Sequence, residues 1–271
     1  MNDKTSKGAA LITGASSGIG AVYADRLAKR GYDLILAARD EVRLNALTAR
    51  LRAETGVTVD VIKADLTVRD DVRRLEARLR DDASVALLIN NAGAALFEPF
   101  AVAAADGLDD LIQLNVTAVT RLANAAAAGF TQRGRGKIVN IGSIVGLMPQ
   151  FKSTVYGATK AYVLYLSESL NDELAGSGVT VQAVLPGATR TEIWDRSGRG
   201  IENVPEEILM HVDELVDAAL AGLDQGELVT IPSLPDAADW DAVAAARANL
   251  QPNLSRPHPA ARYGVRVSEP A

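Results

Sequence analysis

Residues 9–20 read Ala9-Ala10-Leu11-Ile12-Thr13-Gly14-Ala15-Ser16-Ser17-Gly18-Ile19-Gly20, an apolar run that ends in a glycine-rich turn. A helical pattern follows the turn. Glycines between a strand and a helix let the backbone approach a pyrophosphate, to which the helix N-terminus offers free N–H groups. The turn therefore predicts an anion cradle, although its G-x-x-x-G-x-G spacing differs from the general dinucleotide fingerprint. The alternative is a tight turn that only closes a βα unit. The cradle residues are Gly14, Ser16, Ser17, Gly18, Ile19 and Gly20.

The same alternation of short apolar runs and longer helical patterns continues along the chain, which is typical of βαβ units and a parallel sheet. We predict strands at Ala9–Thr13, Asp33–Ala37, Val57–Lys63, Ala86–Ile89, Lys137–Ile141, Thr180–Leu185 and Leu228–Ile231. Helices are expected over 18–30, 40–54, 69–81, 105–132, 154–175 and 212–223, with Gly31, Gly56 and Gly178 at helix ends. The fold class is therefore α/β, a single domain of about seven parallel strands with helices on both faces.

The last twenty residues differ from the rest of the chain. Pro252, Pro257, Pro259 and Pro270 interrupt a stretch with little periodicity. We expect one domain over residues 1–251. Residues 252–271 are expected to form a tail or an arm, with disorder favoured over a fixed structure.

Composition excludes several classes of function. The absence of cysteine among the 271 residues excludes thiol catalysis and thiolate metal sites. His211 and His258 lie far apart without a motif around either, which disfavours serine–histidine hydrolysis and predicts no metal site. The net charge of −6 argues against a nucleic-acid partner. No apolar run approaches the roughly 20 residues of a membrane span. The polar start, residues 1–8, lacks a signal-peptide core, so we expect a cytoplasmic protein.

The end of the second predicted strand indicates which dinucleotide the chain prefers. An acidic residue at this point would bind the ribose hydroxyls of NAD, but the chain has Ala38-Arg39. Arginine matches phosphate in charge and geometry, so Arg39 predicts NADP, with NAD less favoured. Asp40 and Glu41 are expected to begin the next helix. The alternative for Arg39 is an exposed loop residue without a ligand.

Small and polar residues follow the third and fourth predicted strands. Asp65-Leu66 ends one, and Asn90-Asn91-Ala92-Gly93 ends the other. Ligands of open parallel sheets bind beyond the carboxyl ends of the strands, so Asp65, Leu66, Asn91, Ala92 and Gly93 are candidate cofactor residues. Asparagines that satisfy turn amides locally are the alternative.

Tyr156 and Lys160 lie four positions apart in a predicted helix, so their side chains share one face. A free tyrosine has a pKa near 10, and an adjacent ammonium favours the phenolate. We therefore expect Lys160 to lower the pKa of Tyr156, which then acts as general acid or base. A helix at the surface whose lysine reaches water is the alternative.

Over residues 9–192 the chain resembles the short-chain dehydrogenase/reductase family, because the glycine turn, Asn90-Asn91-Ala92-Gly93 and Tyr156-x-x-x-Lys160 occur in the family's order and spacing. The resemblance implies a single doubly wound Rossmann-type domain of α/β class, in agreement with the seven predicted strands. It further implies a catalytic tetrad of Asn115, Ser143, Tyr156 and Lys160. It also implies hydride transfer between NADP(H) and a carbonyl or secondary alcohol, with Ser143 holding the reacting oxygen and Lys160 on the nicotinamide ribose. Asn115 would hold a water linked to the lysine. The nicotinamide would lie near Pro186, Gly187, Thr189 and Thr191, where Thr189 replaces the family's usual apolar residue.

The substrate is less defined. In the family the segment over residues 192–210 closes over the substrate. Ser143, Tyr156 and Trp194 are the candidate substrate residues, and Leu96, Phe97, Leu147, Met148 and Phe151 are apolar side chains that could line the pocket or belong to the core. The nearly all-apolar helix over 155–166 suggests a homodimer or homotetramer. The alternative functions are a non-catalytic dinucleotide-binding sensor or scaffold and an NAD-preferring dehydrogenase of the same fold.

Overall fold

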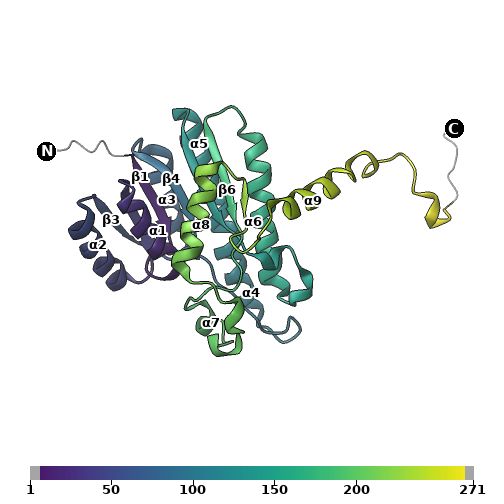
Figure 1. The fold of residues 1–271 in the computed structure, drawn as a ribbon, viewed down its shortest axis with the longest axis horizontal. Helices are drawn as coiled ribbons and strands as arrows, with labels where there is room; N and C mark the ends of the chain where they lie inside the picture. Colours follow the sequence, from purple (N-terminus) through teal and green to yellow (C-terminus); the bar gives the residue numbers. More distant parts are fainter. Residues whose placement is uncertain (1–6, 266–271) are drawn as a thin grey trace. The chain divides into compact units, whose positions relative to one another are not determined.

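The computed structural model describes residues 7–265, and within that range seven parallel strands form one sheet in the order β3-β2-β1-β4-β5-β6-β7 (Figure 1). The strands are β1 (Ala9–Thr13), β2 (Asp33–Ala38), β3 (Val59–Lys63), β4 (Val85–Asn90), β5 (Gly136–Ile141), β6 (Val179–Val184) and β7 (Val229–Thr230). Each predicted strand is present, with ends that differ by at most two residues. The predicted α/β fold class is therefore confirmed.

The helices are α1 (Gly18–Lys29), α2 (Glu41–Thr55), α3 (Arg69–Asp81), α4 (Ala105–Ile112), α5 (Val119–Arg133), α6 (Thr154–Glu173), α7 (Ile193–Arg196), α8 (Val212–Gln225) and α9 (Ala237–Ala248). The predicted helix over 105–132 is interrupted, because a π-helical turn, Gln113–Ala118, joins α4 to α5. Short 3₁₀ turns lie at Ile144–Gly146, Pro149–Phe151, Ile201–Asn203, Glu206–Ile208, Gln251–Asn253 and Ala261–Tyr263.

Alternate residues of the strands enter two apolar clusters, one on each face of the sheet. Ile12 and Leu36 pack with apolar residues of α1, α2 and α8. Leu11 and Ile35 pack with residues of α3 and α5 on the other face (Figure 1). Because both faces are covered, the central strands are apolar throughout instead of alternating with polar residues.

The strand order reverses direction beside β1. The chain runs outward from β1 through β2 to β3, then returns to β4 on the other side of β1 and continues to β7. In open α/β sheets such a switch point opens a crevice at the carboxyl ends of the two strands. The glycine turn follows β1 and Asn91-Ala92-Gly93 follows β4, so both predicted motifs lie at this crevice.

The helix ends follow the sequence signals at most positions. Asp40 is the N-cap of α2 and accepts a hydrogen bond from the Arg43 N–H at 3.0 Å, as expected of a residue that begins a helix. Gly56 ends α2 in the left-handed conformation at φ +74°. Gly178 is a correction: α6 already ends at Glu173, and Gly178 precedes β6 with a φ of +80°.

Helix α6 buries Tyr156 and Lys160 but exposes Tyr165, which is 66% accessible in the single chain. The expected burial on more than one side is therefore incomplete within one copy. Association into a homodimer or homotetramer stays a prediction.

Contacts between residues divide the chain into two compact units, Met1–Pro232 and Ser233–Ala271. The second unit contains α9, a helix that the sequence did not predict and that buries none of its residues. The expected boundary at residue 252 and the expected disorder beyond it stay predictions, and residues 266–271 lie outside the described range. Within residues 7–265, no helix is both long and apolar enough to cross a bilayer.

Candidate active site

The glycine turn leaves no room for a side chain at Gly14 or at Gly20. Gly14 and Gly18 have φ values of +65° and +54°, which favour glycine. A Cβ on Gly14 would lie 2.9 Å from the Ala92 Cα, and a Cβ on Gly20 would overlap the Gly14 carbonyl. Ser17 is the N-cap of α1, and its side chain makes no capping hydrogen bond, so the N–H groups of the first turn can face an anion. The turn thus has the shape and the donors of a phosphate cradle.

Hydrogen bonds join the glycine turn to the end of β4. The Thr13 hydroxyl accepts the N–H groups of Asn91 and Ala92, each at 3.0 Å. Asn91 Nδ2 donates to the Thr13 carbonyl at 2.9 Å and to the Gly14 carbonyl at 3.3 Å. The Asn91 side chain therefore donates to carbonyl groups at the end of β1 rather than within its own turn, and it ties the ends of β1 and β4 together.

Asn115 is fully buried in the π-helical turn and bonds to other segments, not to its own helix. Its Oδ1 accepts the Ala94 N–H at 3.0 Å, and its Nδ2 donates to the Ala94 carbonyl at 2.9 Å and to Thr159 Oγ1 at 3.2 Å. Thr159 in turn donates to the Tyr156 carbonyl at 2.7 Å. Asn115 thus connects the loop after β4 to the helix that carries Tyr156. π-Helical turns occur mostly at functional sites.

Tyr156 and Ser143 lie together at the carboxyl end of β5. Burial raises the pKa of the Tyr156 phenol to about 12, and a hydrogen bond with Ser143 opposes part of this increase. The Ser143 hydroxyl also donates to the Pro186 carbonyl at 3.4 Å. At neutral pH the phenol is protonated, so it can give a proton to a carbonyl oxygen.

Lys160 does not act on Tyr156 as the sequence suggested. Its Nζ donates to the Ile141 carbonyl at 2.9 Å and lies 5.8 Å from the centre of the Tyr156 ring. Burial lowers the pKa of Lys160 to about 8, and Lys160 is not among the causes that shift the pKa of Tyr156. The predicted lowering of the tyrosine pKa is therefore absent in this arrangement, because desolvation outweighs the separated charge.

Lys160 has N–H groups that the Ile141 carbonyl does not use. An ammonium has three N–H groups, and the Ile141 carbonyl takes one of them. A Cβ on Gly93 would lie 3.5 Å from Lys160 Nζ and 3.2 Å from Asn115 Oδ1, so the backbone of the loop after β4 comes close to both. The cradle and the buried ammonium therefore both have N–H groups available to a ligand that accepts hydrogen bonds.

The predicted adenosine end is exposed. The Arg39 side chain is 72% accessible and lies 3.7 Å from Asp65 Oδ2. Asp65 Oδ1 accepts the hydroxyl of Thr67 at 2.8 Å, and Leu66 is 9% exposed. Arg39 thus lies at the crevice with its guanidinium accessible to a phosphate.

The segment after β6 faces the glycine turn. The Pro186 carbonyl accepts the Ile144 N–H at 3.1 Å, and the Thr189 hydroxyl donates to the Gly187 carbonyl at 3.0 Å. Thr191 packs beside Gly18, where an added Cβ would lie 3.4 Å from the Thr191 methyl group. The predicted nicotinamide residues therefore lie across the crevice from the cradle.

Aromatic side chains cover one side of Tyr156. Phe97 meets its ring edge to face at 5.9 Å and stacks on Trp194 at 5.8 Å. Trp194 Nε1 donates to the Thr189 carbonyl at 2.8 Å, and Arg199 lies 5.4 Å over the Phe97 ring. Phe97 and Trp194 thus form an apolar wall beside the phenol.

The other apolar residues that were candidates for the substrate pocket differ in their burial. Leu96 packs with Phe97 in the same small cluster, which also contains Tyr156. Met148 and Phe151 are exposed, at 47% and 50%, and do not belong to it. Sequence reasoning did not single out Thr159, which lies between Tyr156 and Lys160, or Arg43, one helical turn beyond Arg39.

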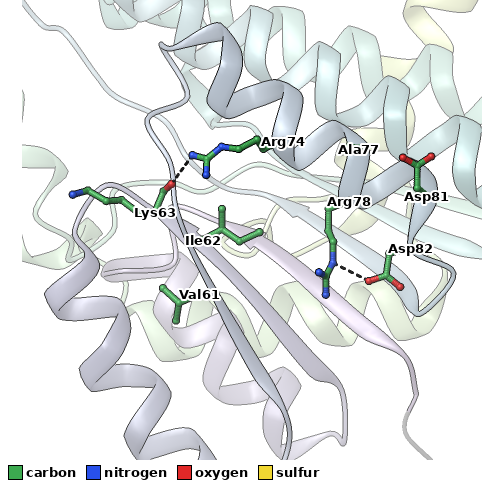
Figure 2. A pocket seen from close by; sticks show the side chains of 8 residues that line it. All are labelled: Val61, Ile62, Lys63, Arg74, Ala77, Arg78, Asp81 and Asp82. Atoms are coloured by element: carbon green, nitrogen blue, oxygen red, sulfur yellow. Dashed lines mark hydrogen bonds and ion pairs between the residues drawn. The ribbon is translucent and has the colours of Figure 1, made fainter.

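A surface hollow of about 660 Å³ lies elsewhere, between β3 and α3 (Figure 2). Arg74 donates to the Lys63 carbonyl at 3.0 Å, and Arg78 pairs with Asp82 at 2.8 Å. The hollow is lined by Val61, Ile62, Lys63, Arg74, Ala77, Arg78, Asp81 and Asp82. None of these is a predicted site residue.

Two solved structures are similar to this chain over nearly its whole length. A short-chain dehydrogenase from Sphingobium yanoikuyae in complex with NADPH is 57% identical with a TM-score of 0.92, covering 94% of this chain and 99% of that one. A bulky-bulky ketone specific alcohol dehydrogenase from Comamonas testosteroni is 52% identical with a TM-score of 0.88, covering 96% and 99%.

Among curated relatives, the very-long-chain 3-oxoacyl-CoA reductase of Anas platyrhynchos is 33% identical over 189 residues, which are 68% of this chain. The match spans only 60% of that relative's length. The family model for the short chain dehydrogenases matches residues 8–202. The chain therefore belongs to the short-chain dehydrogenase/reductase family of oxidoreductases.

Proposed function

We propose that this chain transfers hydride between NADP(H) and a ketone or secondary alcohol with apolar substituents on both sides of the reacting carbon. The observation that carries the proposal is the pairing of Tyr156 with Ser143 in a buried environment that keeps the phenol protonated. When bound, NADPH supplies the hydride. The chain's own residues supply the proton and hold the oxygen that receives it.

Each tetrad residue has a role that its surroundings support. Tyr156 gives its proton to the carbonyl oxygen during reduction, and in the reverse direction its phenolate form takes the alcohol proton. Ser143 donates to the same oxygen as charge develops on it. Lys160 would bind the nicotinamide ribose with its remaining N–H groups. Asn115 fixes the backbone at Ala94 and, through Thr159, the helix that carries Tyr156.

Two observations support the preference for NADP. Arg39 follows β2 at the crevice, where its accessible guanidinium can meet the 2′-phosphate. The similar Sphingobium structure contains NADPH. Support for a bulky ketone comes from the Phe97 and Trp194 wall beside Tyr156 and from the name of the similar Comamonas enzyme.

The test is Tyr156→Phe, assayed with ketones that carry aryl or branched alkyl groups on both sides. Turnover should fall by about 10²–10⁴-fold, because the proton donor is lost. Binding of NADPH, followed by its fluorescence, should be unchanged. Tyr165→Phe is the matched control, since Tyr165 is on the same helix but exposed. Retained turnover in Tyr156→Phe would reject the mechanism.

A further inference from the structure

An ion pair joins two elements that are far apart in sequence. Arg43, in the first turn of α2, donates from Nη1 to both carboxylate oxygens of Glu192, at 2.7 and 2.8 Å. Glu192 is the N-cap residue of α7 and the first residue of the segment that was expected to close over the substrate. The contact therefore ties this segment to the cofactor half of the sheet.

The two residues follow segments that lie at the crevice, the end of β2 and Thr191. Arg43 lies in the first turn of α2, four residues after Arg39, which follows β2 at the crevice. Glu192 directly follows Thr191, whose methyl group packs against Gly18. The contact between Arg43 and Glu192 thus connects the segment after β2 to Thr191, and it bridges the crevice beside the predicted phosphate cradle.

Each partner has a second ion pair that can hold it when the bridge opens. Asp40 Oδ2 lies 3.3 Å from Arg43 Nε. Arg196, one turn along α7, pairs with Glu192. Opening the bridge therefore leaves neither charge alone. The hydrogen bond from Arg43 keeps the pKa of the Glu192 carboxyl below its ordinary value, so it is ionised at neutral pH.

We propose that Arg43 and Glu192 form a clasp that closes over the bound dinucleotide and slows its release. This inference rests on the proposed function, because it requires a dinucleotide in the crevice. The clasp acts by holding the segment after Thr191 in place. It does not read the 2′-phosphate, so it retards NADPH and NADH alike, in contrast to Arg39.

The experiment measures the rate at which bound NADPH and bound NADH leave the full-length protein, by stopped-flow fluorescence after mixing with excess oxidised cofactor. Glu192→Gln keeps the size of the side chain and removes its charge. It should speed release of both cofactors by about three- to fivefold, the effect of losing one exposed ion pair. Arg43→Gln should do the same. The double variant should be no faster than either single variant, because both remove one interaction.

Two controls isolate the contribution of the ion pair between Arg43 and Glu192. Arg196→Gln removes the partner of Glu192 that lies on α7 itself, so release should stay at the wild-type rate. Salt near 1 M should shrink the difference in NADH release rate between the wild-type protein and Glu192→Gln, because an exposed pair is screened at a Debye length of about 3 Å. NADH is used for this control because it lacks the 2′-phosphate, whose contact with Arg39 is also expected to depend on salt. The melting temperature of each variant reports whether it is folded.

Wild-type release rates in Glu192→Gln would overturn the clasp. So would an Arg43→Gln variant that changes release of NADPH but not of NADH, because Arg43 would then read the 2′-phosphate. A wild-type protein that binds neither cofactor would overturn the proposed function itself, and the clasp with it. The failures of the two proposals are thereby distinct.

Discussion

The two ends of the crevice differ sharply in their exposure to water. At the catalytic end, Asn115, Ser143, Tyr156 and Lys160 are 0–8% exposed. At the adenosine end, the side chains of Arg39 and Asp65 are 72% and 34% accessible. The first group is held by direct hydrogen bonds between buried atoms. The second group consists of charges that water and salt can screen.

This difference follows from what each end has to do. A proton donor must hold its pKa and its position to within the length of a hydrogen bond, and burial achieves both. A phosphate needs only a nearby cation with a matching set of donors, which an exposed guanidinium provides. Substitutions should therefore have large effects at the buried end and small, salt-dependent effects at the exposed end.

The largest effect that we predict here is that of Ser143→Ala. Loss of the hydroxyl removes one donor to the reacting oxygen, so turnover should fall by about 10²-fold or more. Cofactor affinity, measured by NADPH fluorescence, should not change. Ser169→Ala is the control, since Ser169 is exposed on α6. A parallel loss of affinity for NADPH would show that the substitution distorts the site, and the assigned role would then be wrong.

Lys160→Met tests the cost of burying an ammonium. The folded pKa of about 8 lies below the ordinary value of 10.5, so the folded state binds the proton less tightly than the unfolded chain. The cost is fully present below pH 8 and declines as the pH rises toward 10.5. At pH 7 the variant should gain about 1–3 kcal/mol in free energy of unfolding, measured in urea without cofactor, while losing activity.

The pH dependence is the decisive part of this prediction. At pH 10 most of the gain in stability should have disappeared. Lys63→Met is the control, because the Lys63 side chain is 66% accessible and should not change stability. An equal gain at both pH values would mean that methionine stabilises through its apolar surface, not through the removed charge.

Arg39→Ala should have the smallest effect and should act at the exposed end. Affinity for NADPH should fall about tenfold, and affinity for NADH should not change, because only NADPH has the 2′-phosphate. Titrations at low and high salt should show the difference shrinking as salt rises. Arg73→Ala, on α3, is the control. Equal losses for both cofactors would contradict the assigned role of Arg39.

Much of the fold was predictable because it depends on local patterns. The apolar runs of β1, β2 and β4 are almost entirely buried, and the helices between the strands begin and end at residues such as Asp40 and Gly56 that signal a boundary. Helix α9 was missed because it has no apolar stripe that is buried. Its many alanines favour a helix by propensity alone, and that signal was available.

The residues of the candidate site could be named from the sequence, but their hydrogen bonds and pKa shifts could not. The spacing of Tyr156 and Lys160 places both on the buried side of α6, as expected. The sequence could not show that Lys160, on α6, donates a hydrogen bond to the carbonyl of Ile141, which is the last residue of β5. The Arg43–Glu192 ion pair joins residues 149 positions apart, so no local pattern could have revealed it.

The π-helical turn at Gln113–Ala118 also limits how this gene can change length. Such a turn holds one residue more than an α-helical turn, and each residue of an α-helix rotates the chain by about 100°. Deleting a single codon here would let the segment close into a regular α-helix. Because the wider turn takes up the extra residue, α4 and α5 would keep their faces in phase, but the turn would lose the register that brings Asn115 to Ala94 and Thr159. Alignments of related sequences should therefore show almost no gaps across these six residues, whereas the loops on either side of the helix pair can vary in length.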